Sequence, residues 1–292
     1  MTTHNAAQTR IREDYARMAR ESDQTDSAGC CSGACGVTET IEPTDLATRI
    51  GYTAAELDAL PKDANMGLSC GNPGAIAALR EGETVLDLGA GAGFDCFLAG
   101  PKVGATGRVI GVDMTHEMVS KARANIDQYA TATGLDNVEF RLGEIEHLPV
   151  ADASVDVILS NCVVNLSFDK QSVWDEVARV LRPGGRVAIS DIALLEPLPE
   201  AVREIAESWA GCVAGASLID DLRAQMTRAG LERIELTPKP EYVAALSSAE
   251  DPLHARIEAT LPTGRTIGEY ITSVDIGAAK PGGCGCSGGS CA

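Results

Sequence analysis

The sequence predicts an α/β protein organised around a doubly wound parallel sheet. From residue 84 onward, short apolar runs alternate with stretches of helical periodicity. The first run stops at an acid and opens into three alternating glycines, Gly89, Gly91 and Gly93. A second run, Arg108–Asp113, follows and again ends on an acid. Together the two stretches predict a parallel strand, a tight turn, a helix start and a second parallel strand.

The elements of this sheet are expected in a regular order. Strands are predicted near 84–88, 108–112, 137–142, 154–160 and 186–191, with helices near 93–100, 115–131 and 171–181 between them. Leu181–Gly185 is expected to end the last of these helices, because proline cannot continue it and glycine supplies a left-handed exit. Further helices are expected within 200–229, and strands at 232–237 and 268–277, whereas 238–265 has no clear pattern.

The segments before the first strand are predicted to form helices that cover the sheet. Apolar residues at helical spacing near residues 11–18 predict a short amphipathic helix, with a solvated arm as the alternative. Residues 44–60 predict two short helices capped by Thr44 and Thr53, with Leu46, Ile50, Leu57 and Leu60 facing inward. We therefore divide the chain into a helical arm and cover (1–64), a core (65–230), the remainder of the sheet (231–279) and a tail (280–292) expected to be disordered without a ligand.

Charge and composition exclude several classes of function. The 24 basic and 42 acidic residues give a formal charge of −18, which argues against binding to a nucleic-acid backbone. The apolar runs are strand-sized, far short of the roughly 20 residues of a membrane span, and the N-terminus lacks an apolar signal region. We therefore expect a cytoplasmic protein that binds neither nucleic acid nor a membrane.

Cysteines are numerous, with ten in 292 residues. In a reducing compartment they are expected to be thiols that bind soft ligands. Cys96, just inside a helix, is expected to be a small buried residue that fills the core. Cys162 follows the fourth strand, where open α/β sheets bind ligands, and is expected to be functional. The other eight lie in glycine-rich or irregular stretches or in the predicted helical region: Cys30, Cys31, Cys35, Cys70, Cys212, Cys284, Cys286 and Cys291.

The glycine-rich turn favours a cofactor that carries a nucleotide. Glycines allow a ligand to approach the backbone closely, and Gly-x-Gly-x-Gly differs from the dinucleotide fingerprint Gly-x-Gly-x-x-Gly, so a pyrophosphate is not the first choice. Asp113 is expected to accept hydrogen bonds from both ribose hydroxyls. Asp87, at the end of the first strand, is expected to orient the turn and the amino acid moiety of the cofactor.

Residues 65–235 resemble the class I S-adenosylmethionine-dependent methyltransferases, and specifically the arsenite methyltransferases. The general resemblance lies in Asp87–Gly93, Val112–Met114 and Leu181–Gly185. The specific resemblance lies in Gly67–Pro73, Gly143–Pro149, Ser160–Leu166 and Trp209–Ala216, three of which contain a cysteine that matches an arsenic-binding cysteine of the family.

The resemblance implies a Rossmann-like α/β fold with a seven-stranded, mostly parallel sheet of order 3-2-1-4-5-7-6, the final strand antiparallel, and helices on both faces. It also implies S-adenosylmethionine as cofactor, trivalent arsenic as methyl acceptor and a thiol reductant such as glutathione or thioredoxin; we expect a monomer. The implied cofactor residues are Asp87, Gly89, Gly91, Gly93, Asp113, Met114, Glu144, Ile145 and Asn161, and the implied arsenic ligands are Cys70, Cys162 and Cys212.

The N-terminal thiols depart from the family pattern. The family has a further cysteine that pairs with the one matching Cys70, and this chain offers Cys30, Cys31 and Cys35, so the pairing stays open; Cys31 and Cys35 are included among the candidate catalytic residues. The roles of Cys284, Cys286 and Cys291 and the number of methyl groups added also stay open.

Two other functions compete with arsenite methylation. A methyltransferase acting on carbon or oxygen of a small acceptor such as a quinone would leave three motif cysteines without a role. A metalloid-binding protein without catalysis would leave the cofactor turn without a role. Trivalent arsenic held by three sulfurs keeps a lone pair that can attack a sulfonium methyl in line, and this step needs no general base.

Overall fold

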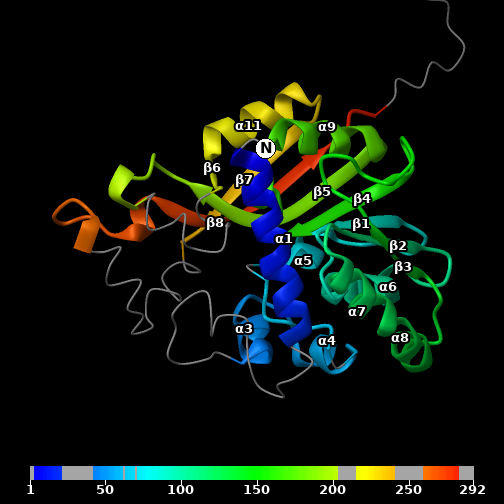
Figure 1. Cartoon of the computed structure of the whole chain (residues 1–292). Helices are drawn as coiled ribbons and strands as arrows, with labels where there is room; N and C mark the ends of the chain where they lie inside the picture. The colour runs from blue at the N-terminus through cyan, green and yellow to red at the C-terminus, as the bar shows by residue number, and fades with distance from the viewer. Residues whose placement is uncertain are drawn as a thin grey trace, which may run out of the picture.

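An eight-stranded mixed sheet with helices on both faces forms the body of the molecule (Figure 1). The structure is a computed structural model that describes residues 3–21, 42–61, 63–69, 71–202, 215–240 and 259–282, without the side chains of 3–7 and Ile76. The strands are β1 (Thr84–Leu88), β2 (Arg108–Asp113), β3 (Val138–Leu142), β4 (Val155–Asn161), β5 (Leu181–Leu194), β6 (Ser217–Leu218), β7 (Glu232–Lys239) and β8 (Ile271–Ala279).

The strand order is β3-β2-β1-β4-β5-β8-β7, with the two-residue β6 paired to the end of β5. Strands β1 to β5 pair in parallel, and β8 runs antiparallel to both β5 and β7. Leaving β6 aside, this is the order 3-2-1-4-5-7-6, so the predicted fold class is confirmed. Strands β7 and β8 continue the sheet of the core and do not form a separate layer.

Two hydrophobic cores lie on opposite faces of the sheet. Helices α5 (Pro73–Ala77), α6 (Phe94–Val103), α7 (His116–Ala124) and α8 (Ile126–Thr133) cover one face, and α9 (Lys170–Val180) and α11 (Ile219–Arg228) cover the other (Figure 1). In β1 the side chains point alternately to the two faces of the sheet. Val85 packs with α6, whereas Leu86 and Leu88 pack in the other core with Trp174 of α9. A strand buried on both faces reads as a continuous apolar run, which is why the sequence identified it.

The N-terminal segment forms the expected helices and lies over the carboxyl edge of the sheet. Helix α1 (Thr3–Glu21) packs on α7 and is joined to the body by an ion pair between Arg12 and Glu144 at 2.6 Å (Figure 1). Helices α3 (Pro43–Arg49) and α4 (Ala54–Asp58) follow, and Leu57 and Leu60 lie half-buried against the core. The predicted amphipathic helix and the two cover helices are therefore confirmed.

The structure corrects three local predictions. Thr53 caps α4 in a capping box with Glu56, but Thr44 lies inside α3, because Pro43 takes the first helical position and Glu42 precedes it. The single helix expected over 115–131 is two, divided at Asn125. Helix α9 ends at an extended Leu181, and the left-handed Gly184 (φ +83°) lies within β5, so the predicted glycine exit is wrong.

Short 3-10 turns close two connections, η1 (Val164–Leu166) after β4 and η2 (Ile267–Glu269) before β8. Among the described residues, no helix combines the length and apolar character needed to cross a bilayer.

Candidate functional site

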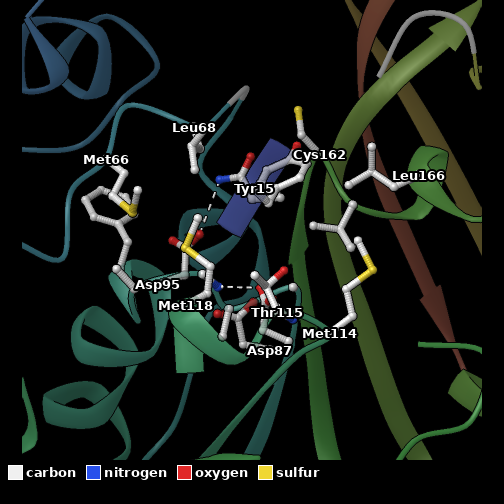
Figure 2. Close-up of a pocket in the computed structure, with 18 of the residues that line it drawn as sticks. Tyr15, Met66, Leu68, Asp87, Asp95, Met114, Thr115, Met118, Cys162 and Leu166 are labelled. Atoms are coloured by element: carbon white, nitrogen blue, oxygen red, sulfur yellow. Dashed lines mark hydrogen bonds between the residues drawn. The ribbon is translucent and has the colours of Figure 1, made fainter. Parts of the chain in front are cut away.

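A cleft opens where the carboxyl ends of β1, β2 and β4 meet, as expected for an open α/β sheet. It encloses about 1000 Å³ of empty space, counting the part open to solvent. Seven segments line it: Gln8 and Tyr15 of α1, five residues of the loop 64–69, the β1 end with the glycine turn and the start of α6 (87–95), Asp113–Thr115, Met118, Ile145–Glu146, and the β4 end with η1 and its flank (161–167). In Figure 2, Tyr15, Leu68 and Cys162 are drawn toward one end, and Asp87 and Thr115 toward the other.

The three glycines of the turn have different environments. Gly91 has φ +51° and no atom within 4 Å of the position that a Cβ would occupy, so its backbone is open to a ligand. A Cβ on Gly89 would lie 2.2 Å from Val163, so this glycine lets the turn pack against the loop after β4. Gly93 does not line the cleft; it begins α6 and packs on Phe97.

Asp113 ties the glycine turn to the end of β2. Its Oδ2 accepts from the N–H of Gly91 at 3.0 Å, and its Oδ1 accepts from the N–H of Thr115 at 2.8 Å. Burial raises the pKa of Asp113, and these two hydrogen bonds oppose that rise. Each oxygen keeps a further lone pair, so the carboxylate can accept more hydrogen bonds from a ligand in the cleft. Met114 lines the cleft beside it.

Two buried carboxylates, Asp87 at the end of β1 and Asp95 at the start of α6, line the cleft. The thiol of Cys96 donates to Asp87 at 3.3 Å, and the hydroxyl of Tyr52 donates to Asp95 at 2.6 Å. Burial raises the pKa of both carboxyls, and repulsion from Asp95 adds to the rise at Asp87. A buried pair of acids facing a cleft is stabilised by a cation, so this part of the site favours a positively charged ligand group.

The chain on either side of Asn161 is fixed by polar contacts. The Nδ2 of Asn161 donates to the carbonyl of Gly71 at 2.8 Å and lies 3.2 Å from Asp95 Oδ2. The next residue, Cys162, donates its N–H to the carbonyl of Ser190 at 2.9 Å. A Cβ on Gly71 would lie 2.5 Å from the side chain of Ser190, so Gly71 packs directly against β5. Gly71 is thereby held between Asn161, at the carboxyl end of β4, and Ser190 of β5.

Cys162 and Cys96 occupy contrasting positions. Cys162 lines the cleft and has φ +57°, a left-handed conformation that is uncommon for residues with a side chain. It is disulfide-bonded in this structure, so the expectation of a free thiol is wrong for Cys162 here. Cys96 is a free thiol and is therefore not its partner. Cys96 is fully buried, and burial together with Asp87 raises the pKa of its thiol well above the ordinary value. The packing role predicted for Cys96 is therefore confirmed.

The structure gathers most of the predicted cofactor residues. Asp87, Gly89, Gly91, Asp113, Met114, Ile145 and Asn161 line one cleft together with Cys162. Glu144 does not line it, because its carboxylate pairs with Arg12 of α1. Among the described residues, no group of three His, Cys, Asp or Glu side chains is arranged to hold a metal ion. The remaining candidate cysteines lie outside the described residues: Cys30, Cys31, Cys35, Cys70, Cys212, Cys284, Cys286 and Cys291.

Several residues of the site were not anticipated from the sequence. Tyr15 lies on the predicted amphipathic helix, where its spacing indicates only a buried face. Asp95 follows the glycine turn, where an acid in the first turn of a helix is ordinary. Met66 directly precedes the motif Gly67–Pro73, and Glu146 lies inside the motif Gly143–Pro149, so these motifs could have indicated both residues. For Tyr52 no local pattern pointed to the site.

The known proteins most relevant to this chain are methyltransferases. Residues 79–233 match a family model described as a methyltransferase domain. The arsenite methyltransferase of Halobacterium salinarum is 47% identical over 280 residues, covering 93% of this chain and 66% of that protein. The arsenite methyltransferase of Aquipseudomonas alcaligenes is 44% identical over 156 residues, covering 52% of this chain and 45% of that protein.

A solved structure extends the comparison to the fold. An arsenic (III) S-adenosylmethionine methyltransferase from Chlamydomonas reinhardtii superposes with a TM-score of 0.61 at 30% identity, covering 82% of this chain and 74% of that one. The chain spans just under two thirds of the length of the Halobacterium relative and less than half of the Aquipseudomonas relative. The matched family model covers more than half of the chain, and the strand order is that of a class I methyltransferase. The chain therefore belongs to the methyltransferase domain family.

Proposed function

We propose that this protein is an S-adenosylmethionine-dependent arsenite methyltransferase that acts in detoxification. One observation carries the proposal: Cys162 lines the same cleft as the open glycine turn and Asp113. Once its disulfide is reduced, Cys162 presents a soft thiol to the same space as a nucleotide-type cofactor site. The similarity to the arsenite methyltransferases of Halobacterium salinarum and Aquipseudomonas alcaligenes supports the choice of substrate.

The residues present fit S-adenosylmethionine. Its amino acid end carries an ammonium, which suits the buried acids Asp87 and Asp95. Its ribose suits the remaining lone pairs of Asp113, and its adenine suits the apolar surfaces of Met114 and Ile145. The open backbone at Gly91 lets the cofactor approach the turn. When bound, the cofactor supplies an electrophilic methyl group.

The thiols would hold the acceptor. We assign Cys162, Cys70 and Cys212 as arsenic ligands; the described geometry supports the first two, since Gly71, next to Cys70, is held by Asn161, next to Cys162. Soft sulfur ligands suit trivalent arsenic far better than imidazole or carboxylate. Three thiols displace the three hydroxyls of arsenous acid as water, which leaves arsenic with three sulfur ligands and a lone pair.

The charge of the cleft selects a neutral acceptor. Four carboxylates line it, those of Asp87, Asp95, Asp113 and Glu146, and no Lys or Arg among the described residues does so. Arsenous acid is uncharged near pH 7, whereas arsenate and phosphate are anions. The acidic lining therefore favours the cationic cofactor and the neutral metalloid and repels the oxidised anion.

Electron balance requires a reductant. When the lone pair of arsenic forms a bond to the methyl carbon, arsenic becomes formally pentavalent, and a further round needs two electrons. Two thiols that join as a disulfide supply them, and glutathione or thioredoxin restores the thiols. We assign this step to Cys70 with a cysteine among Cys30, Cys31 and Cys35. We place the enzyme in the cytoplasm as a monomer.

Arsenic speciation tests the proposal. The reduced protein is incubated with arsenite, S-adenosylmethionine and glutathione, and the products are separated and quantified. Methylated arsenic is expected, with S-adenosylhomocysteine formed in step with the methyl groups. Methylation of a quinone or another organic acceptor without arsenic turnover would support the alternative methyltransferase. Tight arsenite binding without consumption of the cofactor would support a binding protein and exclude the proposed activity.

A further inference from the structure

Tyr52 contacts both the buried acid Asp95 and the backbone of Gly71, although it does not itself line the cleft. Its hydroxyl lies 2.6 Å from Asp95 Oδ1 and 3.2 Å from the carbonyl oxygen of Gly71. A hydroxyl has one proton, so it donates fully to only one of these acceptors at a time. The shorter distance indicates that the hydroxyl donates to Asp95 in this structure.

The ring of Tyr52 is fixed by packing. It is 3% exposed and meets Phe94 edge to face, with ring centroids 4.8 Å apart. It also belongs to the cluster of Ala47 and Leu98, so it anchors the cover between α3 and α4 on helix α6. Because the ring is locked, the choice of acceptor depends on small movements of the hydroxyl and its two partners.

Asn161 reaches the same two acceptors as Tyr52. Its Nδ2 lies 2.8 Å from Gly71 O, 3.2 Å from Asp95 Oδ2 and 3.4 Å from the Tyr52 hydroxyl. Asp95 lines the cleft beside the glycine turn, whereas Gly71 follows Cys70 and Asn161 precedes Cys162. Asp95 belongs to the end of the cleft at the glycine turn (the cofactor end), and Gly71 and Cys162 belong to the other (the thiol end). The two acceptors share the donors Tyr52 and Asn161, and they compete for the single proton of the Tyr52 hydroxyl, whereas the two N–H groups of Asn161 can serve both.

We propose that Tyr52 is a positioning residue that couples the cofactor end to the thiol end, so that each ligand strengthens the binding of the other. The identity of the two ligands rests on the proposed function. A cationic group at Asp95 neutralises that carboxylate and weakens its hold on the shared donors. The Tyr52 hydroxyl and Asn161 then bind the carbonyl of Gly71 more firmly and fix Gly71, the residue after Cys70 in the chain, against the residue that precedes Cys162. By linkage, arsenic bound at the thiols raises cofactor affinity by the same factor.

The protonation of Tyr52 is compatible with this role. Burial, with Asp95 next, raises the pKa of Tyr52 well above its ordinary value, so the hydroxyl stays a neutral donor. Asp87 also acts on Tyr52, and Lys102 and Glu56 act on Asp95; among the described residues, none of these three donates to the carbonyl of Gly71.

The test compares Tyr52→Phe with Tyr129→Phe. Tyr129 is also a buried tyrosine, but its hydroxyl donates to Asn137 Oδ1 at 2.7 Å and not to Asp95 or Gly71. Calorimetry measures the dissociation constant of S-adenosylhomocysteine, which retains the ammonium and ribose, with and without arsenite. In the wild type and in Tyr129→Phe, arsenite is expected to tighten it about fivefold or more. In Tyr52→Phe the ratio is expected to fall close to one.

A second readout does not depend on arsenic. The reduced protein is treated with iodoacetamide, and alkylation of Cys162 is followed by mass spectrometry with and without S-adenosylhomocysteine. The ligand is expected to slow alkylation severalfold in the wild type and to have little effect in Tyr52→Phe. Absence of any ligand effect in the wild type, an unchanged effect in Tyr52→Phe, or equal loss of coupling in Tyr129→Phe would each overturn the proposal. Failure of arsenite methylation, with this dependence intact, would overturn only the proposed function.

Discussion

The two ends of the cleft are built in different ways. At the cofactor end, the contacts join neighbouring strand ends through the backbone, since the N–H groups of Gly91 and Thr115 both bind Asp113. At the thiol end, the contacts join segments far apart in the chain through side chains, since Asn161 binds Gly71 across 90 positions. The glycine turn and Asp113 are therefore held by local backbone donors, whereas Gly71, like Asp95, is held by single side chains from distant segments.

This difference predicts how each end responds to substitution. A site held by backbone donors should tolerate side-chain substitutions, except at the glycines and at Asp113, which accepts the N–H hydrogen bonds. A site held by side-chain contacts should lose its geometry when either partner is removed. The same contrast separates the two described cysteines, because Cys96 packs behind the cofactor end while Cys162 faces the cleft at the thiol end.

The largest effect is expected from Cys162→Ser. A hydroxyl is a poor ligand for trivalent arsenic, so methylation of both arsenite and monomethylarsenite should fall at least 100-fold, in line with about 3 kcal/mol of lost binding. The affinity for S-adenosylhomocysteine should change little. Arsenic speciation and calorimetry measure the two effects.

Cys96→Ser is the matched control for this substitution. It makes the same chemical change at a buried site where the hydroxyl can still donate to Asp87. We expect a loss of about 1 kcal/mol in stability and little change in methylation. If Cys162→Ser kept full activity, or if Cys96→Ser removed it, the division of the cleft would be wrong.

Asp113→Ala tests the backbone-built end. The substitution removes the proposed ribose contacts and releases the N–H groups of Gly91 and Thr115, so cofactor binding should weaken by roughly 1.5–3 kcal/mol, about 10- to 150-fold. Asp113→Asn retains one acceptor oxygen and should lose less. Calorimetry with S-adenosylhomocysteine measures both variants. An unchanged dissociation constant in folded Asp113→Ala protein would remove Asp113 from the site.

The same contrast explains how much of the molecule could be predicted from sequence. The glycine turn, Asp87 and Asp113 are local patterns, and parallel strands bring their carboxyl ends to one edge, so the cofactor end followed from order in the chain. Cys162 was found for the same reason, because it directly follows a strand. Thr44 failed as a cap because Pro43 fixes the helix start, which is a competition between two local signals.

The rest depends on contacts that no local pattern encodes. Tyr52 reads as one apolar residue of a cover, and nothing in its neighbourhood indicates that its hydroxyl reaches Asp95, 43 positions away. Glu144 is the opposite case, because the resemblance to methyltransferases implied a cofactor role for it, whereas in the structure Arg12 of a separate helix pairs with it. Long side chains from an appended helix can redirect a residue whose own strand is correctly predicted.

Asp87→Asn separates affinity from stability at the cofactor end. The buried carboxylate should hold the cofactor ammonium, so cofactor binding should weaken about tenfold in the variant, as for one charged hydrogen bond. Burial raises the folded-state pKa of Asp87, so the native state binds a proton more tightly than the unfolded state, and stability falls as pH rises through that pKa. Removing the charge should therefore raise the melting temperature at pH 7.5 by a few degrees.

The pH dependence of binding gives the opposite sign. Cofactor affinity in the wild type should fall as pH drops through the raised pKa, beginning above the range in which an exposed aspartate titrates, because the protonated acid no longer attracts the ammonium. In Asp87→Asn this fall should be shallower. Thermal melts and binding titrations between pH 5 and 8 measure both trends. A lower melting temperature at neutral pH would show that the charge is compensated in the fold.

The smallest effect is expected from deleting residues 282–292. The described chain leaves β8 at Ala279, and Lys280 closes on β5 through hydrogen bonds with Gly184 and Gly185, at the opposite end of that strand from the cleft. These contacts precede the deletion and should keep the sheet intact. Turnover at saturating arsenite should therefore stay within about twofold of the wild type, because chemistry at the thiol end does not need a segment that leaves the sheet at the opposite end of β5.

At low arsenite the rate should fall more, since loss of three thiols reduces capture of the metalloid. Initial rates over a range of arsenite concentrations separate the two cases, and a large loss of the saturating rate would make the tail part of the thiol end.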